Sequence, residues 1–344
     1  MTGTALIGLG MVSSVYVDAL NRLSVKLELR GVLASSAKSQ DAFLEKHAAA
    51  LPDGCRGYGS VAEIAADPDV EFVIVTTPPN ARRDIVETLA KAGKHVLMEK
   101  PVERTVEAAT ELCEICEAHN VSLGIMLQHR ARPSAVELRG LMEQGDLGDL
   151  LTVEVNVPWW RDQAYYDAPG RGSYERDGGG VLISQAIHTL DLMLSLTGPV
   201  AQVTAMTATS GFHQMESEDF VTAGLKFANG ALGTLFATTA SFPGGAEGIT
   251  LNCRNATVRL MSNELVVNWH NGQTETHGAM ATTGGGADPM AFSSDWHMAV
   301  IEDFVDGLAQ GRAPMVSGRS ALAVHKLIEA IEVSGKTGSR QDVK

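Results

Sequence analysis

"ALIGLGMVSSVYVDAL", Ala5–Leu20, sets the architecture of the first half of the chain. An apolar run ends at Gly8 and Gly10, and a helical pattern follows at once. A strand, a glycine turn and a helix in this order match the motif G-x-G-x-x-G/A, whose glycines permit a tight turn and close approach of backbone amides to a pyrophosphate. Ser13 replaces the third glycine but is still small. The stretch predicts a dinucleotide site, and a plain tight turn is the alternative. The residues expected to hold the cofactor here are Gly8, Gly10, Met11 and Val12.

Short apolar runs alternate with helical patterns from Thr4 to about Gln128. Alternation of this kind predicts a parallel sheet with helices on both faces. After Gly148 the pattern of apolar and polar residues changes, and in "TVEVNV", Thr152–Val157, valines alternate with polar residues. This pattern is typical of a sheet with one solvated or partner-covered face. Asn229-Gly230 and Asn271-Gly272 predict hairpin turns. We therefore expect an α/β protein with a doubly wound Rossmann domain at residues 1–124 and a second domain at residues 125–344.

Composition limits the classes of partner. The chain has 344 residues and a formal net charge of -14, so it is long enough for about two domains and repels polyanions over most of its surface. We expect no nucleic-acid partner. No apolar stretch approaches the roughly 20 residues that cross a bilayer, and no signal peptide is evident, which predicts a cytoplasmic protein without a membrane partner.

A C-x-x-C pair, Cys113 and Cys116, lies in a helical pattern with His119 three residues further on. No second pair of ligands follows elsewhere, so two helix cysteines are a better interpretation than a metal site. We expect no metal.

The end of the second strand bears on the choice of cofactor. NAD-selective sites usually carry Asp or Glu there, whereas "GVLASSAKSQ", Gly31–Gln40, offers Ser35, Ser36 and Lys38. Hydroxyls and an ammonium suit a 2′-phosphate, which favours NADP. The alternative is a polar turn that leads into a helix, with NAD held by other contacts.

"HVLMEKP", His95–Pro101, ends a strand at Glu99 and Lys100. Ligands lie at the carboxyl ends of strands in a doubly wound sheet, and Pro101 restricts the backbone of Lys100 to extended conformations. A lysine beside a cationic nicotinamide ring is a plausible partner for a reacting hydroxyl. On spacing alone, a solvated surface lysine is the simpler interpretation.

"GGGVLISQAIHTLDLM", Gly178–Met193, predicts a helix from about Val181 to Leu196. Residues three or four apart share a helix face. His188 could be an acid–base group or a packed histidine, and Asp191 could orient its ring or be an ordinary polar residue. The residues placed on one side are Ser184, Gln185, His188 and Asp191.

Taken together, "GLG", "TTPPN" at Thr76–Asn80, "EKP" at Glu99–Pro101, the glycine-led helix and "WHMAVIEDFVDGLAQGRAPMVSG" at Trp296–Gly318 resemble the Gfo/Idh/MocA-type oxidoreductases. The resemblance implies a Rossmann domain followed by an α/β domain with an open, mainly antiparallel sheet, often used to form a homodimer or homotetramer. It also implies hydride transfer between NAD(P) and a carbinol of a sugar, polyol or sugar derivative. Binding of NAD(P) and a sugar without turnover, as a sensor or co-repressor, is the alternative.

The resemblance also assigns roles. Lys100 corresponds to the lysine at the reacting carbon, and His188 to the catalytic histidine. The family usually has histidine at Arg82 and aspartate at Ser184. Some sugar-nucleotide dehydrogenases that act on UDP-linked hexosamines or their uronates also lack that aspartate. Further positions that the resemblance places at the cofactor are Thr76, Thr77, Pro78, Pro79, Asn80 and Glu99.

Other polar residues are candidates for the pocket. Gln128, His129 and Arg130 follow the last strand of the first domain, and an aromatic segment precedes the glycines. Aromatic and arginine side chains suit sugar rings and their hydroxyls or phosphates. A loop packed at a subunit interface is the alternative. We expect Gln128 at the cofactor, a structural His297, and substrate contacts from Lys100, Arg130, Trp160, Arg161, Tyr166, Ser184, Gln185 and His188. The segment also contains Trp159, Tyr165 and Arg171.

Overall fold

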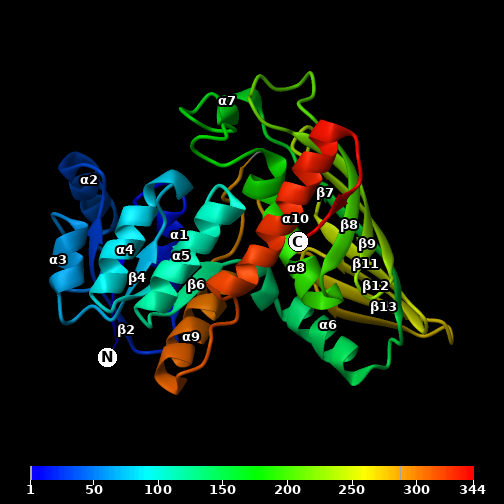
Figure 1. The fold of residues 1–344 in the computed structure, drawn as a ribbon. Helices are drawn as coiled ribbons and strands as arrows, with labels where there is room; N and C mark the ends of the chain where they lie inside the picture. Colours follow the sequence, from blue (N-terminus) through cyan, green and yellow to red (C-terminus); the bar gives the residue numbers. More distant parts are fainter. Residues whose placement is uncertain (1, 287) are drawn as a thin grey trace. The chain divides into compact units, whose positions relative to one another are not determined.

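Six parallel strands form the first sheet, in the order β3-β2-β1-β4-β5-β6 (Figure 1). Every residue of β4 and β6 is buried, so helices cover both faces, as the alternating pattern predicts. The strand order reverses between β1 and β4, which is where doubly wound sheets bind ligands. The strands are β1 Thr2–Ile7, β2 Leu27–Leu33, β3 Arg56–Gly57, β4 Phe72–Val75, β5 His95–Glu99 and β6 Leu123–Met126.

The helices around this sheet form two groups. α3, α4 and α5 pack side by side, and α9 packs on α1. Cys113 and Cys116 lie buried in α5 with free thiols, and burial raises the pKa of both. The helices are α1 Ser13–Arg22, α2 Ala37–His47, α3 Val61–Ala66, η1 Pro79–Ala81, α4 Arg83–Lys91, α5 Val106–Ala118, α9 Asp295–Gln310 and the start of α10 Gly318–Thr337.

The computed structural model describes residues 2–286 and 288–344, and it divides the chain differently from the expected boundary after residue 124. Unit 1 is Met1–Gln128 with Ser293–Leu322, and unit 2 is His129–Phe292 with Ala323–Lys344. The segment Ser293–Leu322 returns to unit 1 because Phe304 of α9 packs on Phe72, with ring centroids 5.3 Å apart, and fills the space over Gly124. Such a long-range contact leaves no periodic signal in the sequence.

Nine strands form the sheet of unit 2, in the order β14-β13-β12-β11-β7-β10-β9-β8-β15. Only β7 and β10 pair in parallel; the other neighbours are antiparallel. Val153, Val155 and Val157 of β7 are buried and the residues between them are exposed, as predicted. The strands are β7 Leu150–Pro158, β8 Val200–Ala208, β9 Phe220–Phe227, β10 Leu232–Thr238, β11 Gly248–Cys253, β12 Ala256–Met261, β13 Glu264–Trp269, β14 Thr274–Gly278 and β15 Gln341–Asp342.

Both predicted hairpins are confirmed. Gly230 lies between β9 and β10 with φ +91°, and Gly272 lies between β13 and β14 with φ +93°. Positive φ is the conformation that glycine adopts without strain. The turns fix the register of both strand pairs.

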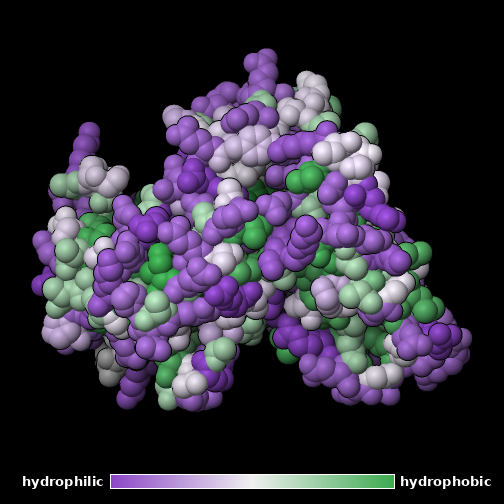
Figure 2. Space-filling view, in the orientation of Figure 1, coloured by the Kyte–Doolittle hydropathy of each residue, from purple (hydrophilic) through white to green (hydrophobic). Residues whose placement is uncertain are grey.

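Helices cover one face of the nine-stranded sheet, with α8 on β7 and β11 and α6 on β13 and β14. Hydrophilic residues predominate on the surface that Figure 2 shows, in keeping with the charged composition. Within residues 2–286 and 288–344, no helix is both long enough and apolar enough to span a membrane. The helices of unit 2 are η2 Gln128–Ala131, which starts at the last residue of unit 1, α6 Pro133–Gln144, α7 Gln163–Tyr166, η3 Leu182–Ala186, α8 Ile187–Thr197 and the rest of α10.

Candidate active site

The glycine turn after β1 has the form that a pyrophosphate site requires. Gly8 has φ +95°, and a Cβ there would lie 2.8 Å from the Thr76 carbonyl carbon, so only glycine fits. At Gly10 a Cβ would meet no atom within 4 Å, so the turn faces open space. The Ser13 hydroxyl donates to the Gly10 carbonyl at 2.6 Å and fastens the turn to the start of α1. A helix N-terminus that follows such an open turn fits a dinucleotide phosphate.

The segment after β4 supplies hydroxyl groups beside this turn. Thr76 Oγ1 donates to the Gly8 carbonyl at 2.5 Å. Thr77 Oγ1 is buried, and within the described part of the chain nothing hydrogen-bonds to it; the same holds for Gln128 Oε1. Buried polar atoms generally have a partner, so these two atoms fit a bound ligand. Pro78 and Asn80 are exposed at η1.

At the end of β2, Ser36 caps α2. Its hydroxyl accepts from Ser39 N at 3.2 Å, so this serine has a structural role in the turn. The Gln40 side chain accepts from Ala34 N at 3.0 Å and holds the same turn. Ser35 and Lys38 stay exposed and are the groups a cofactor phosphate could reach.

Lys100 follows β5, joined to Pro101 by a cis peptide, and is partly exposed. Buried Glu99 lies beside it: one carboxylate oxygen accepts from Tyr16 Oη at 2.8 Å and the other from Lys100 N at 3.1 Å. Burial raises the pKa of Glu99, and the Lys100 charge opposes the rise. His297, also buried, lies edge-on to Tyr16 at 5.6 Å, and burial lowers its pKa to about 4.

Arg82 stands where the resemblance leads us to expect histidine, and it is 2% exposed. Its buried guanidinium bonds the main chain on both sides of Lys100 and at Thr77. Its Nε and Nη2 donate to the Thr77 carbonyl at 3.0 and 2.8 Å. Its Nη1 donates to the Glu99 carbonyl at 2.6 Å and to the Pro101 carbonyl. One guanidinium therefore joins the segments that leave β4 and β5.

In unit 2, His188 lies on a helix that differs from the expected one in its first turn. Residues Leu182–Ala186 form a π-helical turn, and the α-helix α8 continues to Thr197. A π-turn shifts the spacing of residues on a face, and such turns are frequent at functional sites. Ser184 is half-buried, whereas Gln185 and His188 are buried. Gln185 Nε2 donates to Tyr165 Oη at 3.5 Å.

The start of this helix is held by Glu218. Its buried carboxylate accepts from Gly180 N at 3.2 Å and from Leu182 N at 3.0 Å, and its carbonyl accepts from Val181 N at 2.8 Å. Burial raises the pKa of Glu218. Glu332 of α10 is close enough for its own pKa to reach about 7, chiefly through burial and then through Glu218.

His129 packs against His188, with ring centroids 4.8 Å apart and planes inclined by 32°. Its Nε2 faces Nη2 of buried Arg132, which also donates to Glu247 Oε1 at 2.6 Å. A guanidinium can only donate, so Nε2 of His129 accepts, and the ring is neutral with its proton on Nδ1. Glu247 Oε2 also accepts from Thr283 Oγ1 at 2.6 Å. Arg132 and Glu247, 115 positions apart, had no signal in the sequence.

Asp191, expected either to orient His188 or to be an ordinary polar residue, is bonded to Arg130. Its two carboxylate oxygens accept from Arg130 at 2.7 and 2.5 Å, which makes a bidentate ion pair. Burial raises the pKa of Asp191, and Arg130 opposes the rise. Arg130 is expected at the substrate, and its Nε and Nη2 both take part in this pair.

Two other expected substrate residues have internal roles. Buried Arg161 donates to the carbonyls of Trp160, Gly284 and Gly286, each at 2.7 Å. Tyr166 Oη bonds Thr239 Oγ1 at 2.7 Å, and both atoms are buried. Trp160 is half-buried and lies edge-on to two exposed phenylalanines, Phe212 and Phe242.

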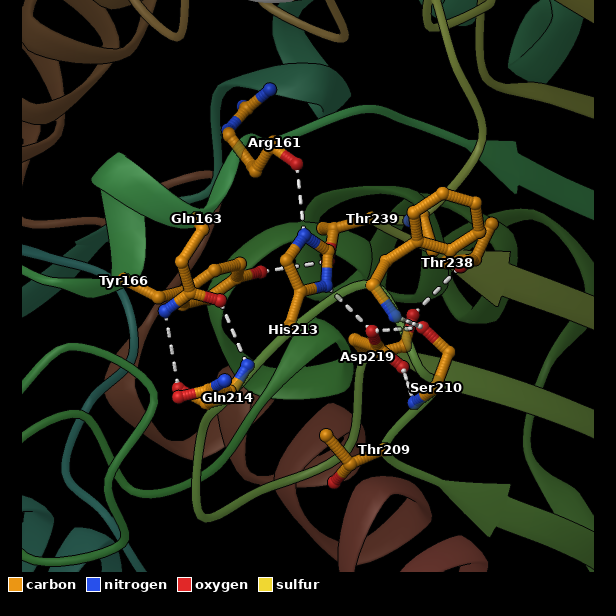
Figure 3. Close-up of polar contacts among 12 residues, drawn as sticks. Arg161, Gln163, Tyr166, Thr209, Ser210, His213, Gln214, Asp219, Thr238 and Thr239 are labelled. Atoms are coloured by element: carbon orange, nitrogen blue, oxygen red, sulfur yellow. Dashed lines mark hydrogen bonds and ion pairs between the residues drawn. The ribbon is translucent and has the colours of Figure 1, made fainter.

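A buried histidine–aspartate pair holds this aromatic segment (Figure 3). His213 Nδ1 lies 2.5 Å from Asp219 Oδ2, and Nε2 lies 2.9 Å from the Arg161 carbonyl. A ring nitrogen that faces a carbonyl must carry a proton, and a second proton must lie between Nδ1 and the carboxylate. Ser210 donates to Asp219 from both its N and its Oγ at 2.6 Å. The pair fastens the loop before β9 to residue 161 and was not anticipated.

Comparison with known proteins finds a family model for each of two long segments of the chain. Residues 2–127 match a family model described as an oxidoreductase family with an NAD-binding Rossmann fold. Residues 135–259 match the GFO/IDH/MocA C-terminal domain.

Individual relatives are enzymes of this kind. D-apiose dehydrogenase of Rhizobium rhizogenes is 25% identical over 84% of each chain. An uncharacterized oxidoreductase of Schizosaccharomyces pombe is 30% identical over 63% of this chain and 58% of its own, so the aligned part spans little more than half of that relative. The solved WlbA dehydrogenase from Bordetella pertussis, in complex with NADH and UDP-GlcNAcA, is 27% identical and superposes with a TM-score of 0.84 over 100% of this chain and 98% of that one.

Proposed function

The chain belongs to the GFO/IDH/MocA family of oxidoreductases, and we propose that it transfers a hydride between a nicotinamide cofactor and a carbinol carbon of a sugar, polyol or sugar derivative. The observation that carries the proposal is the open Gly8–Gly10 turn at the same sheet edge as Lys100. The carboxyl ends of parallel strands meet at one edge, so the turn after β1, Thr77 after β4 and Lys100 after β5 form one cofactor surface.

The chemistry divides between two side chains. A bound nicotinamide would accept the hydride, with its electron pair, from the carbinol carbon during oxidation and return it during reduction. Lys100 binds the hydroxyl oxygen and stabilises the negative charge that develops on it. His188 takes the hydroxyl proton, so the carbinol loses one hydride and one proton and becomes a carbonyl.

The surroundings of His188 support its role as a base. Its neighbour His129 is neutral, and the Arg132 guanidinium lies behind that ring. A neutral neighbouring ring adds no charge next to His188, and the neutral imidazole is the form of histidine that accepts a proton.

For the cofactor we favour NADP over NAD, because exposed Lys38 and Ser35 suit a 2′-phosphate and the stretch from the end of β2 to Gln40 contains no Asp or Glu. For the substrate we favour sugars, including nucleotide sugars, since the WlbA relative was solved with one. We expect a cytoplasmic homodimer or homotetramer that uses the uncovered face of the nine-stranded sheet, where Met206 and Leu232 are exposed.

The test is cofactor reduction with a panel of sugars, polyols and UDP-linked sugars, with NAD and NADP in parallel. Lys100→Ala and His188→Ala should each lower kcat by about 10²–10⁴-fold, the usual worth of an acid–base or charge-stabilising group. The matched control is Lys91→Ala, an exposed lysine on α4. Full turnover in both active-site variants would remove the assigned roles. Tight cofactor binding with no turnover on any substrate would favour a sensor.

A further inference from the structure

The peptide group before Lys100 is bonded at both of its ends. Its oxygen, the Glu99 carbonyl, accepts from Arg82 Nη1 at 2.6 Å. Its nitrogen, Lys100 N, donates to Glu99 Oε2 at 3.1 Å. The carbonyl after Lys100, that of Pro101, also accepts from Arg82. The main chain is thus fixed on either side of Lys100.

The same guanidinium holds a second expected cofactor residue. Arg82 donates to the Thr77 carbonyl through Nε and Nη2, while the Thr77 hydroxyl is one of the buried groups that fit a ligand. The distance between the segments after β4 and β5 is therefore set by one planar, rigid group. Burial lowers the pKa of Arg82 to about 10, with Glu99 and Glu103 opposing the fall, so it remains charged at neutral pH.

We propose that Arg82 is the positioning residue for Lys100, fixing the lysine backbone relative to Thr77 at the cofactor surface. The inference deepens the proposed function and rests on it for the role of Lys100. A misplacement of about 1 Å at a reacting group can cost about 10²-fold in rate, so a group that fixes this backbone acts on kcat without touching the substrate.

Arginine suits this position because it presents donors in several fixed directions at once. Lysine carries its three donors on one nitrogen, and histidine has at most two N–H donors, so neither matches a guanidinium whose three separate nitrogens bond the carbonyls of Thr77, Glu99 and Pro101. The family's usual histidine at this position would hold fewer of them.

The first experiment compares Arg82→Met, Arg82→His and Arg82→Lys with Arg83→Met. Arg83 is the neighbouring arginine, half-exposed and paired on the surface with Glu87 and Glu111, and it serves as the matched control. Arg82→Met should lower kcat by about 10–100-fold while leaving the substrate KM nearly unchanged. The kinetic isotope effect with a deuterated carbinol should rise because hydride transfer becomes slower. Arg82→Lys should recover part of the rate.

A purely structural role gives a different pattern. A lower folded fraction would reduce kcat without altering the isotope effect, and the rate would follow the melting temperature across the variants. That result, or a kcat within twofold of the unsubstituted protein, would overturn the proposal. If Arg82→Met does not fold, the lysine and histidine variants carry the same comparison.

A second readout needs no substrate. In Arg82→Met the Glu99 carbonyl loses its hydrogen bond to a charged group, so local opening of the peptide group that it shares with Lys100 N becomes easier. Hydrogen exchange at the Lys100 amide should therefore become about tenfold faster in this variant and stay unchanged in Arg83→Met. Unchanged exchange would overturn the positioning role. Faster exchange in a protein that turns over no sugar or polyol would instead keep the positioning role and contradict the proposed function.

Discussion

In unit 1 a buried cation holds carbonyl groups beside Lys100, whereas in unit 2 a buried anion holds amide groups at the start of the helix that carries His188. Arg82 bonds the carbonyls of Thr77, Glu99 and Pro101. Glu218 bonds the amides of Gly180 and Leu182. In each case a charged side chain supplies hydrogen bonds to main-chain groups for which a sheet or helix provides no partner.

The two arrangements respond differently to pH. Arg82 has a pKa of about 10 and keeps its charge throughout the physiological range. Glu218 has a raised pKa, and Glu332 beside it titrates near pH 7. The contrast teaches that a cation can bond carbonyls with equal strength over the physiological pH range. Two neighbouring carboxyl groups with raised pKa values instead make the strength of the amide site depend on pH.

The largest effect on stability should come from a substitution that pushes the Glu218 main chain away from Gly180. A Cβ on Gly180 would lie 1.8 Å from the Glu218 carbonyl oxygen, so Gly180→Ala should lower the free energy of unfolding by about 3 kcal/mol. Urea denaturation measures it. The control is Gly211→Ala, whose new Cβ meets no atom within 4 Å. Equal stability of the two variants would show that the Glu218 contacts are not tight.

A smaller, pH-dependent effect should follow from Glu332→Gln. The folded state raises this pKa from 4.5 to about 7, so the stability it contributes is present below pH 4.5 and is lost as the pH rises through 7. The glutamine variant avoids that loss. It should match the original protein at pH 4.5 and exceed its free energy of unfolding by about 2 kcal/mol at pH 8.

Thermal and urea unfolding at several pH values check this difference. Glu143→Gln, at an exposed glutamate on α6, is the control and should show no such trend. A stability difference that stays constant from pH 4.5 to pH 8 would mean that Glu332 does not titrate in this range.

The smallest effect sharpens the description of unit 1. Arg82 holds the Thr77 carbonyl, but the hydroxyl of Thr77 is buried without a bond from the described residues. Thr77→Val should leave stability nearly unchanged and weaken binding of NADH or NADPH by about fivefold, the value of one hydrogen bond. Fluorescence titration measures it, with Thr88→Val on the surface of α4 as the control. Unaltered cofactor affinity would place Thr77 outside the cofactor surface.

Local patterns in the sequence predicted the elements of both units well. The alternation of apolar runs gave the parallel sheet, the valines of β7 gave the covered face, and two Asn-Gly pairs gave hairpins. These signals depend on neighbours within a few positions, where backbone geometry and burial leave a period of two or of 3.6.

The side-chain partners of the candidate site could not be predicted in this way. Asp191 pairs with Arg130, 61 positions away, and Arg161 donates to carbonyls of the segment around Gly285. The π-turn before His188 and the return of α9 to unit 1 likewise depend on packing between distant segments. An arginine in a loop has the same sequence signal whether it binds a substrate or a buried carbonyl.

The helix α10 has a consequence for how such a protein can be rearranged. Residues Gly318–Leu322 of this helix belong to unit 1, and Ala323–Thr337 belong to unit 2. A gene fragment that stops at Gln128 would therefore encode an incomplete nucleotide domain, lacking Phe304 and the rest of α9. Exchange of this domain between relatives by recombination would have to transfer two separate stretches of coding sequence, with one junction inside a continuous helix. The two units are therefore harder to exchange separately than two domains joined by a single linker.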